Sequence, residues 1–537
     1  MTIKPDKVEA ASGADRRWVA LLGIVAVALA LRLIGLRWGL PNSAHYFSYH
    51  PDEIFLLTPS FGFAAGDWNP HFFNYGTLYI YLVGLPAVAL GLVPESSQFP
   101  MGLAPLYLLA RLVTAALGTA TVLVLYAAIR SEGHRFALLG AGLLSVTALH
   151  VVTSHYATVD VPATFLIGVA FLAALRSAPR PRFRPAVLGG VCVGLAAATK
   201  YNVGLFIIPV ALAPLVCQRV RPPAAWWPGI AIGALTGFVI GNPYVGSSEF
   251  ARGFLFELRH AQVGGTLAFV DTGSGWVYHL ARGIPISLGY PMTIAAIIGI
   301  VFALRGRSPS GRLSVVWIAV YLIAIGFGKE RFIRYLVPLT PFLAILAALG
   351  LIGLTGQFRR AWPRVFARAA AGVVVLLTAL YAFGQTAPFV RTDPRDGAWL
   401  SLQPTLDEMR VGLAQAPWYY HPPVSPFNAG AFSQGLFEKW NQSVGERVAV
   451  TGWDAELLEA SPPYAFCLSD LEVNDMIRLG EPAAIQMLNM LQQTYQGQAV
   501  WGRPPEFFSW LAPSREWAPP DWLYLSPRIT VYYDPKQ

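Results

Sequence analysis

Charged residues and cysteines are both scarce in this sequence. Only 13% of the 537 residues are charged, and 55% are hydrophobic, whereas roughly a quarter of an ordinary soluble domain is charged. The chain has three cysteines, and Cys467 stands alone in the C-terminal region. We therefore expect neither a disulfide between outer segments nor a zinc-finger site. The composition also excludes a protein that is soluble along its whole length.

Apolar runs long enough to cross about 30 Å of hydrocarbon recur through the first 390 residues. They predict a mainly α-helical, polytopic membrane bundle. Eleven crossings are expected, near residues 18–37, 106–129, 136–153, 160–176, 185–200, 203–217, 226–241, 286–304, 312–327, 335–355 and 369–388.

Arginine-rich loops predict the orientation of these spans, because such loops stay in the cytoplasm. The clusters lie at 130–135, 176–184, 219–221, 305–312 and 359–368. With the amino terminus inside and an odd number of crossings, the tail from residue 391 is expected outside. The clusters account for much of the net charge of +9, so no nucleic-acid partner is expected. The predicted location is a bacterial inner membrane.

The segments expected on the outer side include a first outer loop, a loop at residues 242–284 and the tail. Within a first outer loop, residues 38–105, the apolar stretch 78–92 would invert the orientation pattern as a single crossing, so it is expected along the interface or re-entrant. Residues 1–390 are then the membrane domain. Residues 391–537 predict a small α/β outer domain, with strands at 447–450, 464–468 and 529–533 and a helix at 483–495.

The densest polar cluster next to the membrane lies in the first outer loop. The motif Pro51-Asp52-Glu53 is followed by a polar and aromatic segment that contains His71. Ionisable residues close to the spans are functional candidates by default. Those on the same predicted side are Asp160, Lys200, Arg331 and Arg334.

In this order, the motifs resemble those of the GT-C membrane glycosyltransferases. The motifs concerned are Pro51-Asp52-Glu53, Gly66-Asp67-Trp68 with Pro70-His71, Arg111, Asp160-Val161-Pro162, Ala198-Thr199-Lys200, and Arg334-Tyr335 with Pro338 and Pro341. The chain looks most like the branch of protein O-mannosyltransferases and lipid A aminoarabinose transferases. The resemblance implies transfer of mannose or another hexose or pentose from a polyprenyl-phosphate donor to a protein, lipid or glycan hydroxyl.

The resemblance places the catalytic base on Asp52, with Glu53 and Asp160 as further carboxylates of the catalytic site. An attacking hydroxyl must lose its proton, and displacement of polyprenyl phosphate from the opposite face of the sugar inverts the anomeric centre. Cations around the departing phosphate stabilise the transition state. The residues expected to bind that phosphate are Lys200, Arg331, Arg334, Arg111 and His71.

A metal ion is left open. The aminoarabinose branch carries a Glu-Lys-Pro stretch that supplies a metal ligand and a phosphate-binding lysine, where this chain has Asn74-Tyr75-Gly76. Some GT-C members use a divalent cation and others do not. Histidines at 45, 50 and 71 are the other possible ligands, with a merely structural role as the alternative.

Each assignment also has a structural alternative. The two aspartates could begin helices, Lys200 could snorkel to the interface, the arginines of the 331–334 loop could be ordinary loop charges, and Arg111 could pair with a buried carboxylate. At the level of function, an oligosaccharide ligase or polymerase, a secondary transporter and an adhesion protein are the competing hypotheses. The sequence lacks the paired interrupted helices typical of transporters.

Overall fold

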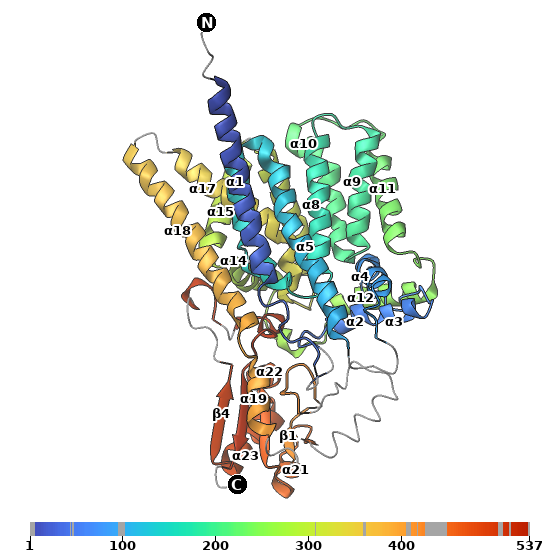
Figure 1. Cartoon of the computed structure of the whole chain (residues 1–537), viewed down its shortest axis with the longest axis vertical. Helices are drawn as coiled ribbons and strands as arrows, with labels where there is room; N and C mark the ends of the chain where they lie inside the picture. Colours follow the sequence, from blue (N-terminus) through green and yellow to red (C-terminus); the bar gives the residue numbers. More distant parts are fainter. Residues whose placement is uncertain are drawn as a thin grey trace.

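The computed structural model consists of a helical bundle and a smaller C-terminal domain that projects from one end of it (Figure 1). We call this end of the bundle the tail end. The residues that the structure describes are 6–94 except 43–44 and 46–47, 102–357 except 307, 361–403, 410–424 except 416, 448–502, and 509–534 except 515–516.

Six helical segments in the described part of the chain are long and apolar enough to cross a membrane. At a rise of about 1.5 Å per residue, 18 residues extend roughly 27 Å, close to the thickness of the hydrocarbon core. The segments are built from α5 (Ala104–Ile129) with η1 (Arg130–Glu132), α8 (Asp160–Ser177), η2 (Tyr201–Phe206) with α10 (Ile207–Gln218), α16 (Pro309–Gly326), η5 (Ile333–Leu339) with α17 (Thr340–Gln357), and α18 (Ala361–Thr386) with η6 (Ala387–Val390) and α19 (Pro394–Leu402).

A bent pair of helical segments would be a seventh span, so the described residues give six or seven rather than the predicted eleven. Each of the eleven predicted segments nevertheless contains a helix. The difference arises from helices that are short or divided, and from α1, which carries three arginines. They are α1 (Asp6–Leu33), α6 (His134–Ser145) and α7 (Ala148–Thr153), α9 (Phe183–Ala197), α11 (Trp226–Gly241), and the bent pair of α13 (Gly275–Tyr278), η4 (His279–Gly283) and α14 (Ile284–Leu288) with α15 (Tyr290–Arg305).

Glycines allow close backbone contact between α9 and α11. A Cβ atom added at Gly190 or Gly194 would overlap the backbone of α11, and one added at Gly233 or Gly237 would overlap the backbone of α9. Small residues let helix backbones touch in this way within membranes. The contact fixes α9, whose end leads directly to Lys200.

Short helices of the first loop gather at the tail end of the bundle (Figure 1). The helix α4 has only 12 residues, too few to cross a bilayer, in keeping with the prediction for 78–92. Its Leu78 N–H donates to the Ala198 carbonyl at 3.0 Å, which ties the loop to the end of α9. The helices of this end are α2 (Glu53–Leu57), α3 (Pro59–Ala64), α4 (Leu78–Ala89), α12 (Ser248–Val263) and η3 (Leu267–Phe269).

The C-terminal domain contains a five-stranded mixed sheet of order β2-β1-β3-β5-β4. The strand β1 pairs in parallel with β2 and β3, and β5 pairs antiparallel with β3 and β4. The elements are β1 (Val411–Leu413), β2 (Val448–Val450), α21 (Ala455–Ala460), β3 (Ala465–Ser469), α22 (Asp470–Arg478), α23 (Pro482–Thr494), β4 (Gly497–Trp501), η8 (Ser509–Leu511), α24 (Pro520–Leu523) and β5 (Ile529–Tyr533).

The three strands and the helix predicted for this domain are confirmed, although Arg447 lies outside the described residues. The sequence missed β1 and β4. The strand β1 has only three residues, and β4 alternates partly buried and exposed side chains at a sheet edge. The domain boundary at residue 390 stays a prediction.

The orientation of the bundle also stays a prediction, and the structure supplies the positions that test it. Gln493 in α23 and Arg180 after α8 are both exposed, the first in the tail and the second in an arginine-rich loop. We expect a cysteine at Gln493 to react with an impermeant thiol reagent in intact spheroplasts, and one at Arg180 to react only after lysis. The reverse pattern would place the tail in the cytoplasm.

Candidate active site

Asp52 lies at the tail end of the bundle in an ion pair with Arg334. The distance between Asp52 Oδ2 and Arg334 Nη2 is 3.3 Å, and the Asp52 side chain is 24% exposed. Asp52 directly precedes α2, but its carboxylate accepts no hydrogen bond from that helix. The carboxylate therefore does not act as a helix cap here, and it is the accessible member of the Asp52-Glu53 pair.

Arg334 also faces a carboxylate of the C-terminal domain, Asp521. Asp521 Oδ2 lies 3.8 Å from Arg334 Nη1, and this nitrogen is buried without a hydrogen bond in the structure. Sequence reasoning did not single out Asp521, because nothing in Pro519-Pro520-Asp521 distinguishes it from an ordinary helix start.

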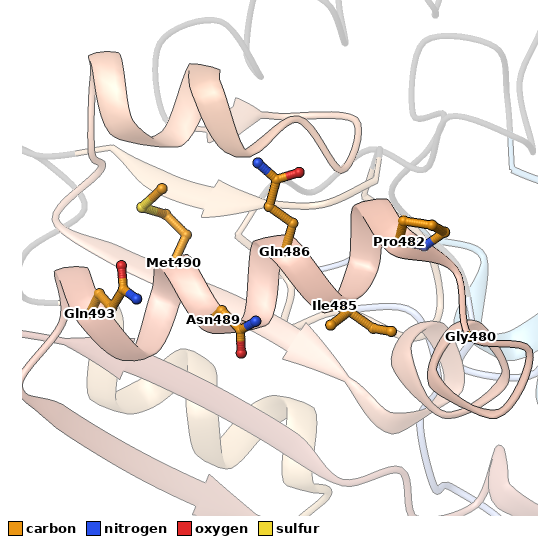
Figure 2. Close-up of a pocket in the computed structure, with 7 residues that line it drawn as sticks. All are labelled: Gly480, Pro482, Ile485, Gln486, Asn489, Met490 and Gln493. Carbon is orange, nitrogen blue, oxygen red and sulfur yellow. The ribbon is translucent and has the colours of Figure 1, made fainter.

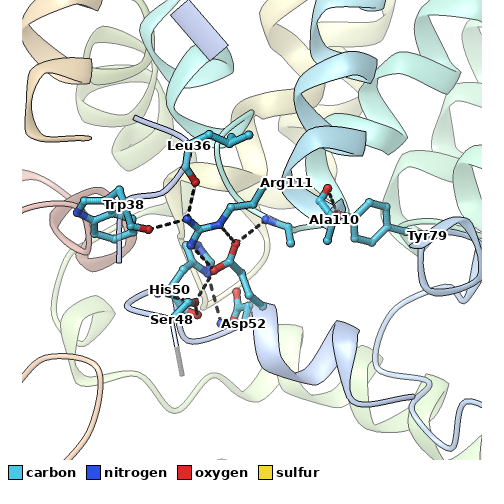
Figure 3. A network of polar contacts seen from close by, with 10 residues as sticks. Leu36, Trp38, Ser48, His50, Asp52, Tyr79, Ala110 and Arg111 are labelled. Atoms are coloured by element: carbon cyan, nitrogen blue, oxygen red, sulfur yellow. Dashed lines mark hydrogen bonds and ion pairs between the residues drawn. The ribbon is translucent and has the colours of Figure 1, made fainter. Parts of the chain in front are cut away.

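Glu53 belongs to a buried polar network around Arg111, and Figure 3 shows this network from close by. The Arg111 guanidinium donates to both Glu53 oxygens, at 2.8 and 2.7 Å, and to the backbone carbonyls of Leu36 and Trp38. The Ala157 N–H donates to Glu53 at 2.7 Å. Burial alone would raise the pKa of Glu53, but the guanidinium holds that pKa below its usual value. Both side chains are almost fully buried.

Lys200 and Asp160 form a second buried ion pair, with 2.5 Å between Nζ and Oδ1. The Lys200 ammonium also lies 4.9 Å from the centre of the Tyr335 ring, next to Arg334 in sequence. Lys200 is only 5% exposed, so it does not extend to the surface as a snorkelling lysine would.

Arg331 and His71 have other neighbours. Arg331 donates to the Thr272 hydroxyl and lies 5.7 Å from the Tyr278 ring centre. His71 is exposed and has Asp67 and Glu249 on its two ring nitrogens, each at 2.9 Å. The hydrogen bond with Asp67 raises the pKa of His71. The described contacts give neither residue an ion pair with Asp52.

Glu257 of α12 is a further carboxylate of this region that sequence reasoning missed. Lys200, Arg334 and Asp52 all contribute to its electrostatic environment, and burial raises the pKa of its carboxyl group. A possible signal was its position in an amphipathic helix of the 242–284 loop, but its sequence context resembles no motif.

The described residues contain no group of three His, Cys, Asp or Glu side chains arranged to hold a metal ion. His50 is buried, which lowers its pKa, and its Nδ1 accepts the Asp52 N–H at 3.3 Å.

A hollow of about 430 Å³ lies elsewhere, on α23 of the C-terminal domain (Figure 2). None of its seven lining residues is charged, so it offers neither a base nor a phosphate-binding cation. These seven residues are Gly480, Pro482, Ile485, Gln486, Asn489, Met490 and Gln493.

Comparison with known proteins decides the class of the chain. Residues 106–242 match the family model of dolichyl-phosphate-mannose-protein mannosyltransferases. The chain is a GT-C membrane glycosyltransferase. This enzyme belongs to the group that depends on a polyprenyl-phosphate sugar, so the predicted resemblance is confirmed and the transporter and adhesion hypotheses are dropped. The matched part of the glycosyltransferase contains Arg111, Asp160 and Lys200, but not Asp52 or Arg334.

One solved structure shows the same fold at low sequence identity, and a second is reported beside it. The apo oligosaccharyltransferase of Archaeoglobus fulgidus is 12% identical with a TM-score of 0.51, over 90% of this chain and 73% of that chain. ArnT of Cupriavidus metallidurans bound to undecaprenyl phosphate is 16% identical with a TM-score of 0.49, over 96% of this chain and 98% of that one. No match is found among curated protein sequences.

The buried contacts of Arg111 predict a stability effect. Arg111→Gln leaves the Glu53 carboxylate buried without its cation, which typically costs about 3–5 kcal/mol. We expect a large fall in the melting temperature of the glycosyltransferase in detergent. Arg252→Gln, at an exposed position of α12, should leave it unchanged. Unchanged melting of the Arg111 variant with a loss of phosphate binding would instead support a direct contact with the donor.

Proposed function

We propose that the enzyme transfers one sugar from polyprenyl phosphate to a hydroxyl acceptor with inversion, and that Asp52 is the general base. The sugar is mannose or another hexose or pentose, and the acceptor is a protein, lipid or glycan. The reaction takes place at the tail end of the bundle, on the outer face of a bacterial inner membrane. The observation that carries the proposal is the Asp52-Arg334 pair, in which a partly exposed carboxylate adjoins a guanidinium with an unused buried N–H.

The proposed step exchanges one bond for another at the anomeric carbon. The acceptor oxygen forms a bond to this carbon and its proton passes to the Asp52 carboxylate. The bond from the carbon to the phosphate oxygen breaks, and its electron pair leaves with polyprenyl phosphate. The leaving group thereby gains one negative charge, which a nearby cation stabilises more in the transition state than in the donor.

Arg334 is suited to this change of charge because its two terminal nitrogens have different partners. Nη2 lies 3.3 Å from Asp52, whereas Nη1 makes no hydrogen bond. In the proposed reaction the guanidinium turns toward the donor phosphate and withdraws from Asp52. A carboxylate relieved of a paired cation is a stronger base. Donor binding and activation of the base are therefore linked through one side chain.

Lys200 is proposed as the second phosphate-binding cation, with Asp160 as its counter-ion. The pair lies beside Tyr335, and Lys200 and Asp52 both influence Glu257, which supports a common site. Burial raises the pKa of Glu257. A higher pKa favours the neutral form of this carboxyl group, which reduces repulsion of an incoming phosphate.

Glu53 and Arg111 are proposed to position Asp52 rather than to touch the donor. Their polar atoms face one another and the backbone of two segments, at Leu36 and Trp38 and at Ala157. Arg331 and His71 receive less support as phosphate ligands. Arg331 donates to Thr272, and His71 pairs with Asp67 and Glu249.

Replacement of the base tests this proposal. Asp52→Asn keeps the shape of the side chain but cannot accept the proton, and loss of a general base typically costs a hundredfold to ten-thousandfold in rate. We expect the transfer rate to fall by this factor. The rate is measured as the disappearance of sugar from the lipid-linked pool, in membranes of a deletion strain that expresses each variant. Binding of undecaprenyl phosphate should persist. Asp271→Asn, at an exposed loop carboxylate, is the matched control, and a near wild-type rate for Asp52→Asn would refute the assignment.

Lys200 is tested by binding alone. Lys200→Gln keeps a hydrogen-bond donor for Asp160 but removes the charge, so affinity for undecaprenyl phosphate should weaken by roughly 1.5–3 kcal/mol. The double variant Lys200→Gln/Asp160→Asn removes the unpaired carboxylate and controls for its effect on folding. Wild-type affinity in both variants would leave Lys200 with a structural role only.

A further inference from the structure

We infer that the C-terminal domain completes the active site, and that Asp521 is the positioning residue that holds Arg334 between this domain and Asp52. The inference rests on the proposed function of the Asp52-Arg334 pair. It assigns a role to a domain whose described residues include neither the base nor the phosphate-binding cations proposed above.

The contacts of Asp521 fix the backbone on which Arg334 is mounted. Asp521 Oδ1 accepts the N–H of Ile333 and Oδ2 accepts the N–H of Arg334, both at 3.0 Å. These two N–H groups lie at the start of η5, where no preceding turn can satisfy them. One carboxylate of the C-terminal domain therefore caps this helical segment of the bundle and determines where the Arg334 side chain begins.

The same carboxylate limits the directions in which the guanidinium can point. Arg334 Nη1 lies 3.8 Å from Asp521 and Nη2 lies 3.3 Å from Asp52. All three side chains are at most a quarter exposed. Arg334 lies between two carboxylates, so Asp521 still supplies a counter-charge when the guanidinium leaves Asp52. Arg334 can therefore turn toward a phosphate without being left unpaired.

The segment that carries Asp521 is itself anchored on the bundle. Trp522 packs against the apolar cluster that contains Trp38 and Phe389. The Tyr524 ring lies 5.6 Å from the His50 ring. The Tyr524 carbonyl accepts a hydrogen bond from Arg395 at 2.9 Å. Asp521 therefore sits on a segment with little freedom to move relative to the first loop.

A junction at the start of the C-terminal domain reinforces this placement. Arg395 is fully buried and donates to both oxygens of Asp393, each at 2.7 Å. Asp393 in turn accepts the Trp38 indole N–H at 3.0 Å, and Asp396 accepts the Tyr49 hydroxyl. These contacts join the beginning of the domain to Trp38 and Tyr49 of the first loop. Tyr49 lies three residues before Asp52.

The test compares transfer with binding in variants of Asp521. Asp521→Asn keeps one oxygen for a backbone N–H but removes the charge opposite Arg334. We expect the transfer rate in membranes to fall roughly 10- to 100-fold, as for a small misplacement of a catalytic group. The number of undecaprenyl phosphate sites per protein should stay at the wild-type value, with affinity within about threefold or tighter, because a negative charge near the phosphate is lost.

Arg478→Gln is the matched control. Arg478 also joins the C-terminal domain to the bundle, through the carbonyls of Leu267 and Val270, but it makes no described contact with Arg334. We expect its transfer rate to be near that of the wild type. If Asp521→Asn does not fold, Asp521→Glu keeps the charge and both oxygens but displaces them by one methylene, and should show the same loss of rate with intact binding.

The outcomes separate this inference from the proposed function. A near wild-type rate for Asp521→Asn while Asp52→Asn is inactive overturns the inference and leaves the base in place. Loss of rate and of binding sites in equal proportion, or an equal loss in Arg478→Gln, also overturns it, because Asp521 would then be merely structural. An active Asp52→Asn variant refutes the proposed function by itself.

Discussion

The Glu53 carboxylate is the constraint on which the tail end of the bundle depends. It accepts hydrogen bonds from Arg111 of α5, from Ser48 of the first loop and from the backbone of Ala157 just before α8. A buried carboxylate is costly unless its oxygens are satisfied by a cation and by further donors. Because Glu53 meets this requirement with groups from three segments, none of the three can shift without exposing a buried charge.

Because of this constraint, the two adjacent carboxylates have different roles. Glu53 is fully buried and held by Arg111, so it is unavailable to a substrate, whereas Asp52 is partly exposed and, among the described residues, forms an ion pair with Arg334. The network around Glu53 gives Asp52 a fixed backbone from which to work. In the proposed reaction, Arg334 first pairs with the base Asp52 and later pairs with the phosphate that leaves.

Local sequence signals predicted much of the fold but little of its three-dimensional pairing. The apolar runs predicted where helices form, and short β-type runs predicted three of the five described strands of the tail. By length and composition, the described helices give six or seven candidate spans, fewer than the eleven predicted. The number is smaller partly because α9 and α11 are short and a predicted span is divided between α6 and α7. Hydropathy reports that a segment is apolar and says less about where a helix begins and ends.

The same limit applies to the candidate site. The sequence singled out Asp52 and Arg334, which lie in one ion pair, and Asp160 and Lys200, which form another. It also grouped Arg111 and Glu53 with these residues, and the structure shows that those two side chains bind each other. Asp521 was missed because its partners are backbone N–H groups nearly two hundred residues away, and no local pattern encodes such a contact.

The central claim is that Arg334 passes from Asp52 to the donor phosphate, and a structure of the enzyme with undecaprenyl phosphate bound tests it most directly. The account predicts that the phosphate lies within hydrogen-bond distance of Arg334 and Lys200, that Arg334 has moved away from Asp52, and that Asp521 still holds the backbone of residues 333 and 334. A phosphate bound at Arg331 or His71, with Arg334 still on Asp52, would contradict the account.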